Sequence, residues 1–143
     1  METYYQTPFV DISWEADPGC VYTAWHGYHT DEQGRHALEK GLELLVQKGA
    51  HCWLGDQRHR AVFSLSFQQW SDEQWFPRAI ASGLRRLAIV NSDSALTRMA
   101  ANRLAGDLAA RGLAVAFFND PDAARSWLRD SATNGLGPRP SGQ

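Results

Sequence analysis

The chain has 143 residues, of which 43% are hydrophobic and 21% are charged, and its formal net charge is −2. This length fits one domain that can bury a core of its own. The near-neutral charge favours neither nucleic acid nor an anionic membrane as a partner, because both select strongly basic surfaces. No apolar run reaches the roughly 18 residues that a membrane-spanning helix requires, and the N-terminus lacks a signal-peptide pattern. We therefore expect a cytoplasmic protein without a membrane partner.

The N-terminal part of the sequence predicts a β-hairpin. Residues 1–8 have no clear periodicity and are expected to form a loosely ordered lead-in. β-favouring residues fill 9–14 and 20–25, and the segment between them has the composition of a turn. Two strands joined by so short a turn are expected to pair antiparallel.

The middle of the chain predicts two helices separated by a strand and a loop. Thr30 to Gln33 match a capping box, which starts a helix over 31–48. A short buried strand is expected over 50–55, and the irregular segment 57–69 is expected to be a loop held down by its aromatic residues. A second capping box, residues 71–74, predicts another helix, which either begins near Trp75 or kinks, because Pro77 follows closely.

The C-terminal part alternates strands and helices. The apolar run 87–90 is typical of a central parallel strand, and a helix ending at Arg111 precedes a strand over 113–118. Asp120-Pro121 is a strong start signal for a last helix. Residues 131–143 are rich in Gly, Pro and Ser, so a disordered tail is expected there.

The expected order of elements is β-β-α-β-α-β-α-β-α. This order predicts a single α/β domain over residues 9–130, with a mixed five-stranded sheet and helices packed on it. The Gly-x-Gly-x-x-Gly pattern that binds dinucleotides is absent from the sequence, and we expect no cofactor.

Several short sequence motifs, taken in order, resemble those of a known family. They are Val21-Tyr22-x-x-Trp25-x-Gly27-Tyr28, Ala37-Leu38-Glu39-Lys40-Gly41-Leu42-Glu43-Leu44, Trp53-Leu54-x-Asp56-x-Arg58, Trp75-Phe76-Pro77-Arg78-Ala79 and Leu87-Ala88-Ile89-Val90. The chain resembles the bacterial STAS-like proteins, which are relatives of the anti-sigma-factor antagonists. The resemblance is to a small stand-alone branch of largely uncharacterised members.

This resemblance implies a non-enzymatic switch or docking module. The better-known antagonists carry a phosphorylatable Ser or Thr directly after an Asp, in the loop between the third strand and the second helix. Asp56 holds a comparable place here, but Gln57 follows it. Ser64 and Ser66 lie further along and are only weak candidates for phosphorylation, so the phosphoswitch does not carry over.

Asp56 and Arg58 form the first candidate site. They lie two residues apart beyond a strand end, where both side chains can face a crevice and Arg58 can bind an anion or a partner carboxylate bidentately. The alternative is structural: Asp56 caps backbone N–H groups and pairs with Arg58 or Arg78 to hold the loop.

An aromatic set with one guanidinium forms the second candidate site. Its members are Trp70, Trp75, Phe76 and Arg78. They would stack a planar ligand or anchor a partner, because Trp and Arg are enriched at binding surfaces. The alternative is that Trp75 and Phe76 belong to the core.

We therefore favour a non-catalytic module that binds a protein partner or a small ligand at the loop after the third strand and the start of the second helix. The alternative function is a carrier of a small apolar or lipid-like ligand, in a pocket lined by Phe63, Phe67, Trp70 and Trp75. An enzyme built on Asp56 and His59 is the least supported hypothesis.

The histidines lack metal-ligand spacing, so no metal is expected. Six Trp residues exceed what one small core usually buries, which predicts a homodimer.

Overall fold

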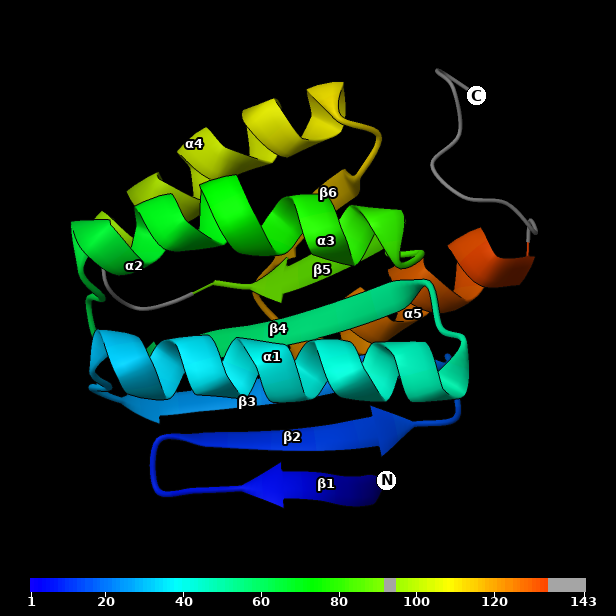
Figure 1. The fold of residues 1–143 in the computed structure, drawn as a ribbon. Coiled ribbons are helices and arrows are strands. Elements are labelled where there is room, and N and C mark those ends of the chain that lie inside the picture. The colour runs from blue at the N-terminus through cyan, green and yellow to red at the C-terminus, as the bar shows by residue number, and fades with distance from the viewer. Residues whose placement is uncertain (92–94, 134–143) are drawn as a thin grey trace.

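The computed structural model describes residues 1–91 and 95–133, which form a six-stranded sheet with helices on both faces (Figure 1). The strands follow the sequence order across the sheet, and β1, β2 and β3 pair antiparallel, whereas β3 to β6 are parallel. The strands are β1 (Glu2–Gln6), β2 (Val10–Glu15), β3 (Cys20–Gly27), β4 (Cys52–Arg60), β5 (Arg86–Val90) and β6 (Ala114–Phe118). The helices are α1 (Asp31–Lys48), α2 (Leu65–Trp70), the π-helical η1 (Ser71–Trp75), α3 (Phe76–Ala81), α4 (Ala95–Ala110) and α5 (Pro121–Thr133).

The predicted α/β class with a mixed sheet is confirmed, but the prediction of five strands is wrong. The additional strand, β1, lies in the segment expected to be a lead-in, and it pairs antiparallel with β2 at the edge of the sheet. Its residues Glu2, Thr3 and Gln6 are polar and its side chains are exposed or half-buried. A strand held mainly by backbone hydrogen bonds to one neighbour leaves little hydrophobic pattern in the sequence.

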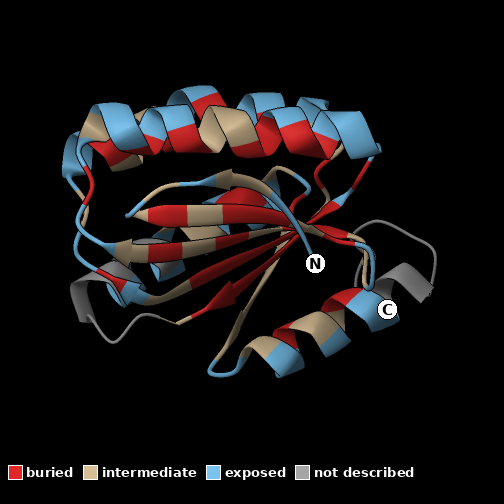
Figure 2. Cartoon of the chain, turned by 90° about the horizontal axis from the view of Figure 1, so that it is seen from below, coloured by how far each residue is buried: buried red, intermediate tan, exposed pale blue. Residues whose placement is uncertain are grey.

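Two apolar cores lie on the two faces of the sheet, and Figure 2 shows the buried residues concentrated on the strands and on the inner sides of the helices. The side chains of β4 contribute alternately to the two cores, because successive side chains of a strand point to opposite faces of the sheet. Trp53 belongs to the larger core, which includes residues of α1, α3 and α4. Cys52 and Leu54 belong to the smaller core beneath α5.

The α1 helix begins and ends as predicted. The Thr30 hydroxyl accepts a hydrogen bond from the Gln33 backbone N–H at 3.1 Å, and the Gln33 side chain accepts one from the Thr30 backbone. At the other end, Gly49 takes the left-handed conformation, with φ of 59°, that closes a helix without steric penalty.

The expected loop over 57–69 and the expected cap at residue 71 are corrected by the structure. β4 continues to Arg60, and α2 starts after Ser64, whose hydroxyl accepts a hydrogen bond from the Phe67 N–H at 2.9 Å. Ser71 lies inside a continuous helical run, and its hydroxyl donates to the Phe67 carbonyl. The π turn of η1 ends two residues before Pro77, which is the second residue of α3, so the continuous helical run accommodates a residue that the interior of a regular α-helix would not.

The last helix, α5, is longer than expected. It continues through Thr133 and so includes the first residues of the expected disordered tail. The remainder of that tail, 134–143, lies outside the described residues.

Candidate functional site

A cavity of about 100 Å³ lies between the sheet and the helices α1, α2, η1 and α3. Protein interiors hold few voids larger than a water molecule, so a space of this size in the larger core stands out. Its wall is mostly aromatic and aliphatic, with a few polar side chains and one guanidinium. The lining residues are Thr23, Trp25, Leu38, Trp53, Gly55, Gln57, Arg60, Phe63, Phe67, Gln68, Ser71, Trp75, Phe76, Leu87 and Ile89.

Two indoles of the wall are fixed by hydrogen bonds as well as by packing. Trp53 Nε1 donates to the Thr23 hydroxyl at 3.1 Å, and Trp75 Nε1 donates to the Leu38 carbonyl at 3.0 Å. The two rings meet edge to face with their centres 5.1 Å apart. Because each buried N–H has an acceptor, these rings present only apolar surface to the cavity.

Arg60, at the end of β4, carries the guanidinium of the wall. Strict alternation would place it on the same face as Asp56, but the pairing of β3 with β4 is irregular between Ala24 and His26. Gln57 and Arg60 both line the cavity although they are three residues apart, so the irregularity turns the strand by one position. Arg60 is buried, with 6% of its surface exposed.

Aromatic rings and a histidine surround the Arg60 side chain. Its Cζ lies 3.9 Å from the centre of the Trp25 ring, 4.2 Å from that of Phe63 and 5.5 Å from that of Phe67. Its Nη2 lies 2.8 Å from His29 Nε2. A cation over aromatic faces is favoured most where water is excluded, as it is here.

The geometry assigns the tautomer of His29. Its Nδ1 lies 2.9 Å from the Thr30 carbonyl, which can only accept, so Nδ1 carries the proton and Nε2 accepts from Arg60. Burial, and then the charge of Arg60, lower the pKa of His29 from its ordinary value of 6.5. Burial also lowers the pKa of Arg60, to about 9, so the guanidinium is protonated and the imidazole neutral at pH 7.

Asp56 and Arg58, the first candidate site, lie on the opposite face of the sheet. Arg58 donates to Asp56 from Nε at 3.0 Å, from Nη2 at 2.8 Å and from its backbone N–H at 3.1 Å, and the Tyr22 hydroxyl donates at 3.0 Å. Burial alone would raise the pKa of Asp56, but the hydrogen bonds from Arg58 and Tyr22 outweigh it, and this pKa is lowered. Burial, followed by the charge of Asp56, raises the pKa of Tyr22 to about 12.

The residues of the second candidate site are spread over several environments. Trp75 and Phe76 are buried in the larger core and line the cavity. Trp70 is half-buried and does not line the cavity, and the Cζ of Arg35 lies 5.3 Å from its ring centre. Since Asp56 and Arg58 face α5, the structure does not bring the two predicted sites together.

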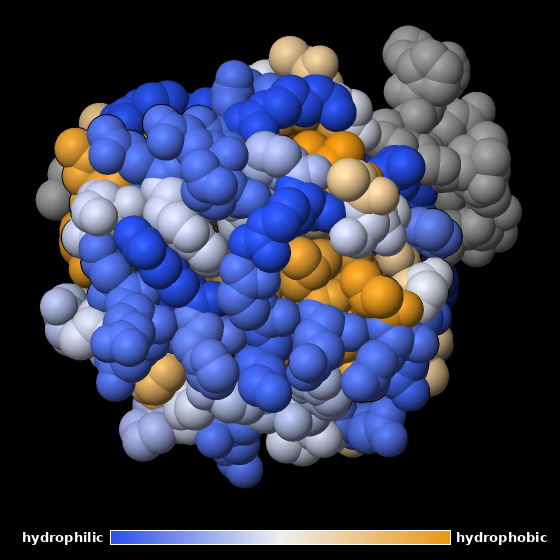
Figure 3. Space-filling view, in the orientation of Figure 1, coloured by the Kyte–Doolittle hydropathy of each residue, from blue (hydrophilic) through white to orange (hydrophobic). Residues whose placement is uncertain are grey.

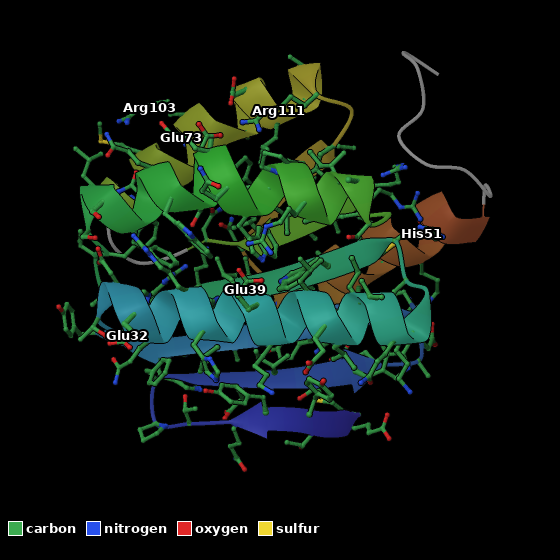
Figure 4. The ribbon with its side chains drawn as sticks, in the orientation of Figure 1. Glu32, Glu39, His51, Glu73, Arg103 and Arg111 are labelled. Carbon is green, nitrogen blue, oxygen red and sulfur yellow. The ribbon has the colours of Figure 1, made fainter. Side chains whose placement is uncertain are left out.

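Arg78, the remaining member, lies at the surface between α1 and α3. Apolar side chains gather there on the face shown in Figure 3, where Leu42, Val46 and Ala81 line an open groove. Glu39 lies on the side of α1 that faces α3 (Figure 4), and its carboxylate accepts hydrogen bonds from Arg78, one of them at 2.9 Å.

The weak phosphorylation candidates lie at the start of α2. Ser64 caps the helix and donates to the Asp31 carboxylate at 2.5 Å, so its hydroxyl is part of the junction between α2 and α1. Ser66 is exposed, and so is His59, the residue considered for an enzymatic role with Asp56.

Among the described residues, no three His, Cys, Asp or Glu side chains lie close enough to hold a metal ion. The described part of the chain also contains no helix that is long and apolar enough to cross a membrane.

Comparison with known proteins identifies the fold of the chain. No protein-family profile matches the chain, and no curated protein matches it either. A solved structure does match: an uncharacterised protein of the DUF3478 family with a SpoIIAA-like fold from Shewanella loihica PV-4. The TM-score is 0.54 at 21% sequence identity, over 83% of this chain and 91% of the other. The order of strands and helices and this likeness together give the chain a SpoIIAA-like, that is STAS-like, fold.

Proposed function

We propose that the protein is a non-enzymatic binding module that holds a small, largely apolar ligand in the cavity between the sheet and α1–α3. The observation that carries this proposal is the cavity itself, with its wall of indole and phenyl rings. Ligand sites are concave and mostly apolar, with a few polar groups that fix orientation. An apolar cavity of roughly 150 Å³ takes up benzene, so one of about 100 Å³ limits the enclosed part of a ligand to at most a single small ring or a short branched chain.

This proposal develops the carrier alternative drawn from the sequence. Of the four aromatic residues predicted to line such a pocket, Phe63, Phe67 and Trp75 do line the cavity, and Trp70 does not. The wall also includes Trp25 and Trp53, from β3 and β4, which the sequence did not indicate.

A cavity-filling variant tests the proposal. Gly55 lines the cavity, and a Cβ added there would lie 3.7 Å from the Thr23 hydroxyl oxygen, which is an ordinary contact. Gly55→Val should therefore fold and occupy part of the space with a residue that suits a strand. Gly106→Val is the matched control, because a Cβ at Gly106, on the exposed side of α4, meets nothing within 4 Å.

The measurement is a titration of the wild-type protein with toluene, followed through the indole N–H resonances in an NMR spectrum. We expect saturable shifts in the wild type and in Gly106→Val, and none in Gly55→Val. Wild-type resonances that do not saturate, or that respond as they do in Gly55→Val, would contradict the proposal.

A second candidate function, self-association, is favoured by the groove between α1 and α3. Val46, which is 58% exposed, lines this groove together with the carboxylates of Glu39 and Glu43 and the guanidinium of Arg78. A surface with both signs of charge around an apolar strip can complement a second copy of itself, as a twofold interface requires. Sedimentation should show a dimer that Val46→Glu converts to monomer, and a wild-type protein that stays monomeric at high concentration would exclude it.

A further inference from the structure

The cavity has one feature that an apolar ligand alone would not use, namely the guanidinium of Arg60. Burying a cation in a low-dielectric wall carries a large desolvation free energy, and an aromatic residue of the same volume would fill the space without it. Arg60 reaches this wall only because β4 departs from regular alternation after Asp56. The guanidinium of Arg60 therefore places a positive charge at the site where the ligand is proposed to bind.

The surroundings hold this guanidinium in position. The rings of Trp25 and Phe63 lie against it, with their centres 3.9 Å and 4.2 Å from Cζ, and neutral His29 accepts from Nη2. His29 is itself oriented by the Thr30 carbonyl at the start of α1. A guanidinium has five N–H donors in a planar fork, and rings on its faces direct ligands toward its edge.

We propose that the ligand of the cavity is a small organic carboxylate with a compact apolar or aromatic body, and that Arg60 binds its carboxylate. The inference rests on the proposed binding function and names the chemical class of the ligand. A carboxylate matches the planar fork bidentately. Its single charge is easier to desolvate than the two charges of a phosphate monoester, and its apolar body fits the remaining wall of Trp53, Trp75 and Phe67.

An isosteric pair of probes separates charge from shape. Benzoate and benzamide have nearly the same size and planarity, but only benzoate is charged at pH 7. Wild-type protein is titrated with each, and the indole N–H resonances report the dissociation constants. A charge-assisted bidentate contact in a water-excluded site should make benzoate bind at least about tenfold more tightly than benzamide.

Substitution of Arg60 then locates the preference. Arg60→Met keeps an unbranched side chain of similar length without the charge, and it should weaken benzoate binding by about tenfold or more while benzamide binding changes by less than about threefold. Arg60→Lys keeps the charge but loses the fork, and its benzoate affinity should fall between the two. Arg78→Met is the matched control at an exposed guanidinium outside the cavity and should leave both affinities unchanged.

The outcomes distinguish this inference from the function on which it rests. If wild-type protein binds both probes equally, or if Arg60→Met keeps the preference for benzoate, Arg60 is a structural cation and the inference is overturned while the binding module stands. If neither probe nor toluene binds, the binding module itself is wrong. The wild-type comparison needs no variant, so it decides the ligand class even where Arg60→Met fails to fold, and Arg60→Lys, which keeps the charge, then tests the role of the fork.

Discussion

The two faces of the sheet use charged side chains in opposite ways. On the face covered by α5, carboxylates and guanidinium groups satisfy one another: Asp56 binds Arg58, and Glu15 binds Arg125 at 2.8 and 2.9 Å. On the face covered by α1–α3, Arg60 lies among aromatic rings at the wall of a cavity. Both arrangements draw on β4: Asp56 and Arg58 pair with each other within the strand, whereas Arg60, at its end, faces the cavity.

The first prediction concerns the aromatic wall, where the largest effect is expected. Trp75→Ala should lower the free energy of unfolding by about 3–5 kcal/mol, because it removes a buried indole and leaves a larger cavity. Urea denaturation measures the change. Trp127→Ala is the control on the α5 face, where the indole is only half-buried against Phe118. A loss for Trp75→Ala no larger than that for Trp127→Ala would contradict the division of the core.

The second prediction concerns the ion pairs of the α5 face. Glu15→Gln should cost about 2 kcal/mol, because the Glu15 side chain is 6% exposed and its loss of charge leaves Arg125 poorly paired, although that residue keeps some contact with water. Asp122→Asn removes an exposed partner of the same guanidinium and should cost no more than about 0.5 kcal/mol. Equal effects of the two substitutions in thermal unfolding would show that burial of the pair does not matter.

The third prediction tests where the helix beside the cavity begins. Ser64→Ala should cost about 1 kcal/mol, because it removes the cap of α2 and the contact with Asp31. Ser66→Ala, on an exposed position of the same turn, should change stability by less than about 0.5 kcal/mol. Equal losses at the two serines would argue against Ser64 as the cap.

The fourth prediction compares the pH dependence of one buried group on each face, His29 and Asp56. Since the folded-state pKa of His29 is lowered, the unfolded chain takes up a proton first, and the free energy of unfolding should fall as the pH drops below about 6.5. Asp56 has a lowered pKa, so its contribution is complete above pH 3.8 and is lost only as the pH falls below that value. The contributions of His29 and Asp56 are therefore lost in different pH ranges.

Urea denaturation at pH 7.5 and 5.5 measures the first of these ranges. His29→Asn should reduce the difference between the two values, whereas His59→Asn, at an exposed position, is the matched control and should not. A pH dependence that survives His29→Asn in full would place the titrating group elsewhere.

Local patterns predicted the parts of the fold that depend on neighbours in the sequence. The capping box at Thr30 and the terminal Gly49 define α1 with both ends as expected, and the apolar run at 87–90 is a central strand. Edge strand β1 was missed because it has one neighbour and few buried side chains. The start of α2 was missed because the four residues from Ser71 have the composition of a capping box, although they lie inside a helix.

The cavity could be predicted only in part, for a similar reason. Phe63, Phe67 and Trp75 were expected to line a pocket because aromatic residues gather in that stretch. Arg60 was not expected to line the pocket, since its position depends on an irregular pairing between β3 and β4, which changes the face of the sheet on which a side chain lies. Alternation counted from Asp56 assigns Arg60 to the wrong face, and no single-residue property of the sequence reveals the shift.

The π turn of η1 has a consequence for the spacing of buried residues. Phe67, Ser71, Trp75 and Ala79 are all buried and follow one another at intervals of four. In a regular α-helix of 3.6 residues per turn, each interval of four rotates the side chain by about 40°, so Ala79 would point roughly 120° away from Phe67. A wider turn takes up part of this drift and keeps the row against the sheet. Deleting one residue from the segment between Ser71 and Trp75 would place Trp75 seven residues after Phe67, and a regular helix then brings the two within about 20° of the same face, so the shortened helix should lose the π turn and keep Trp75 against the wall.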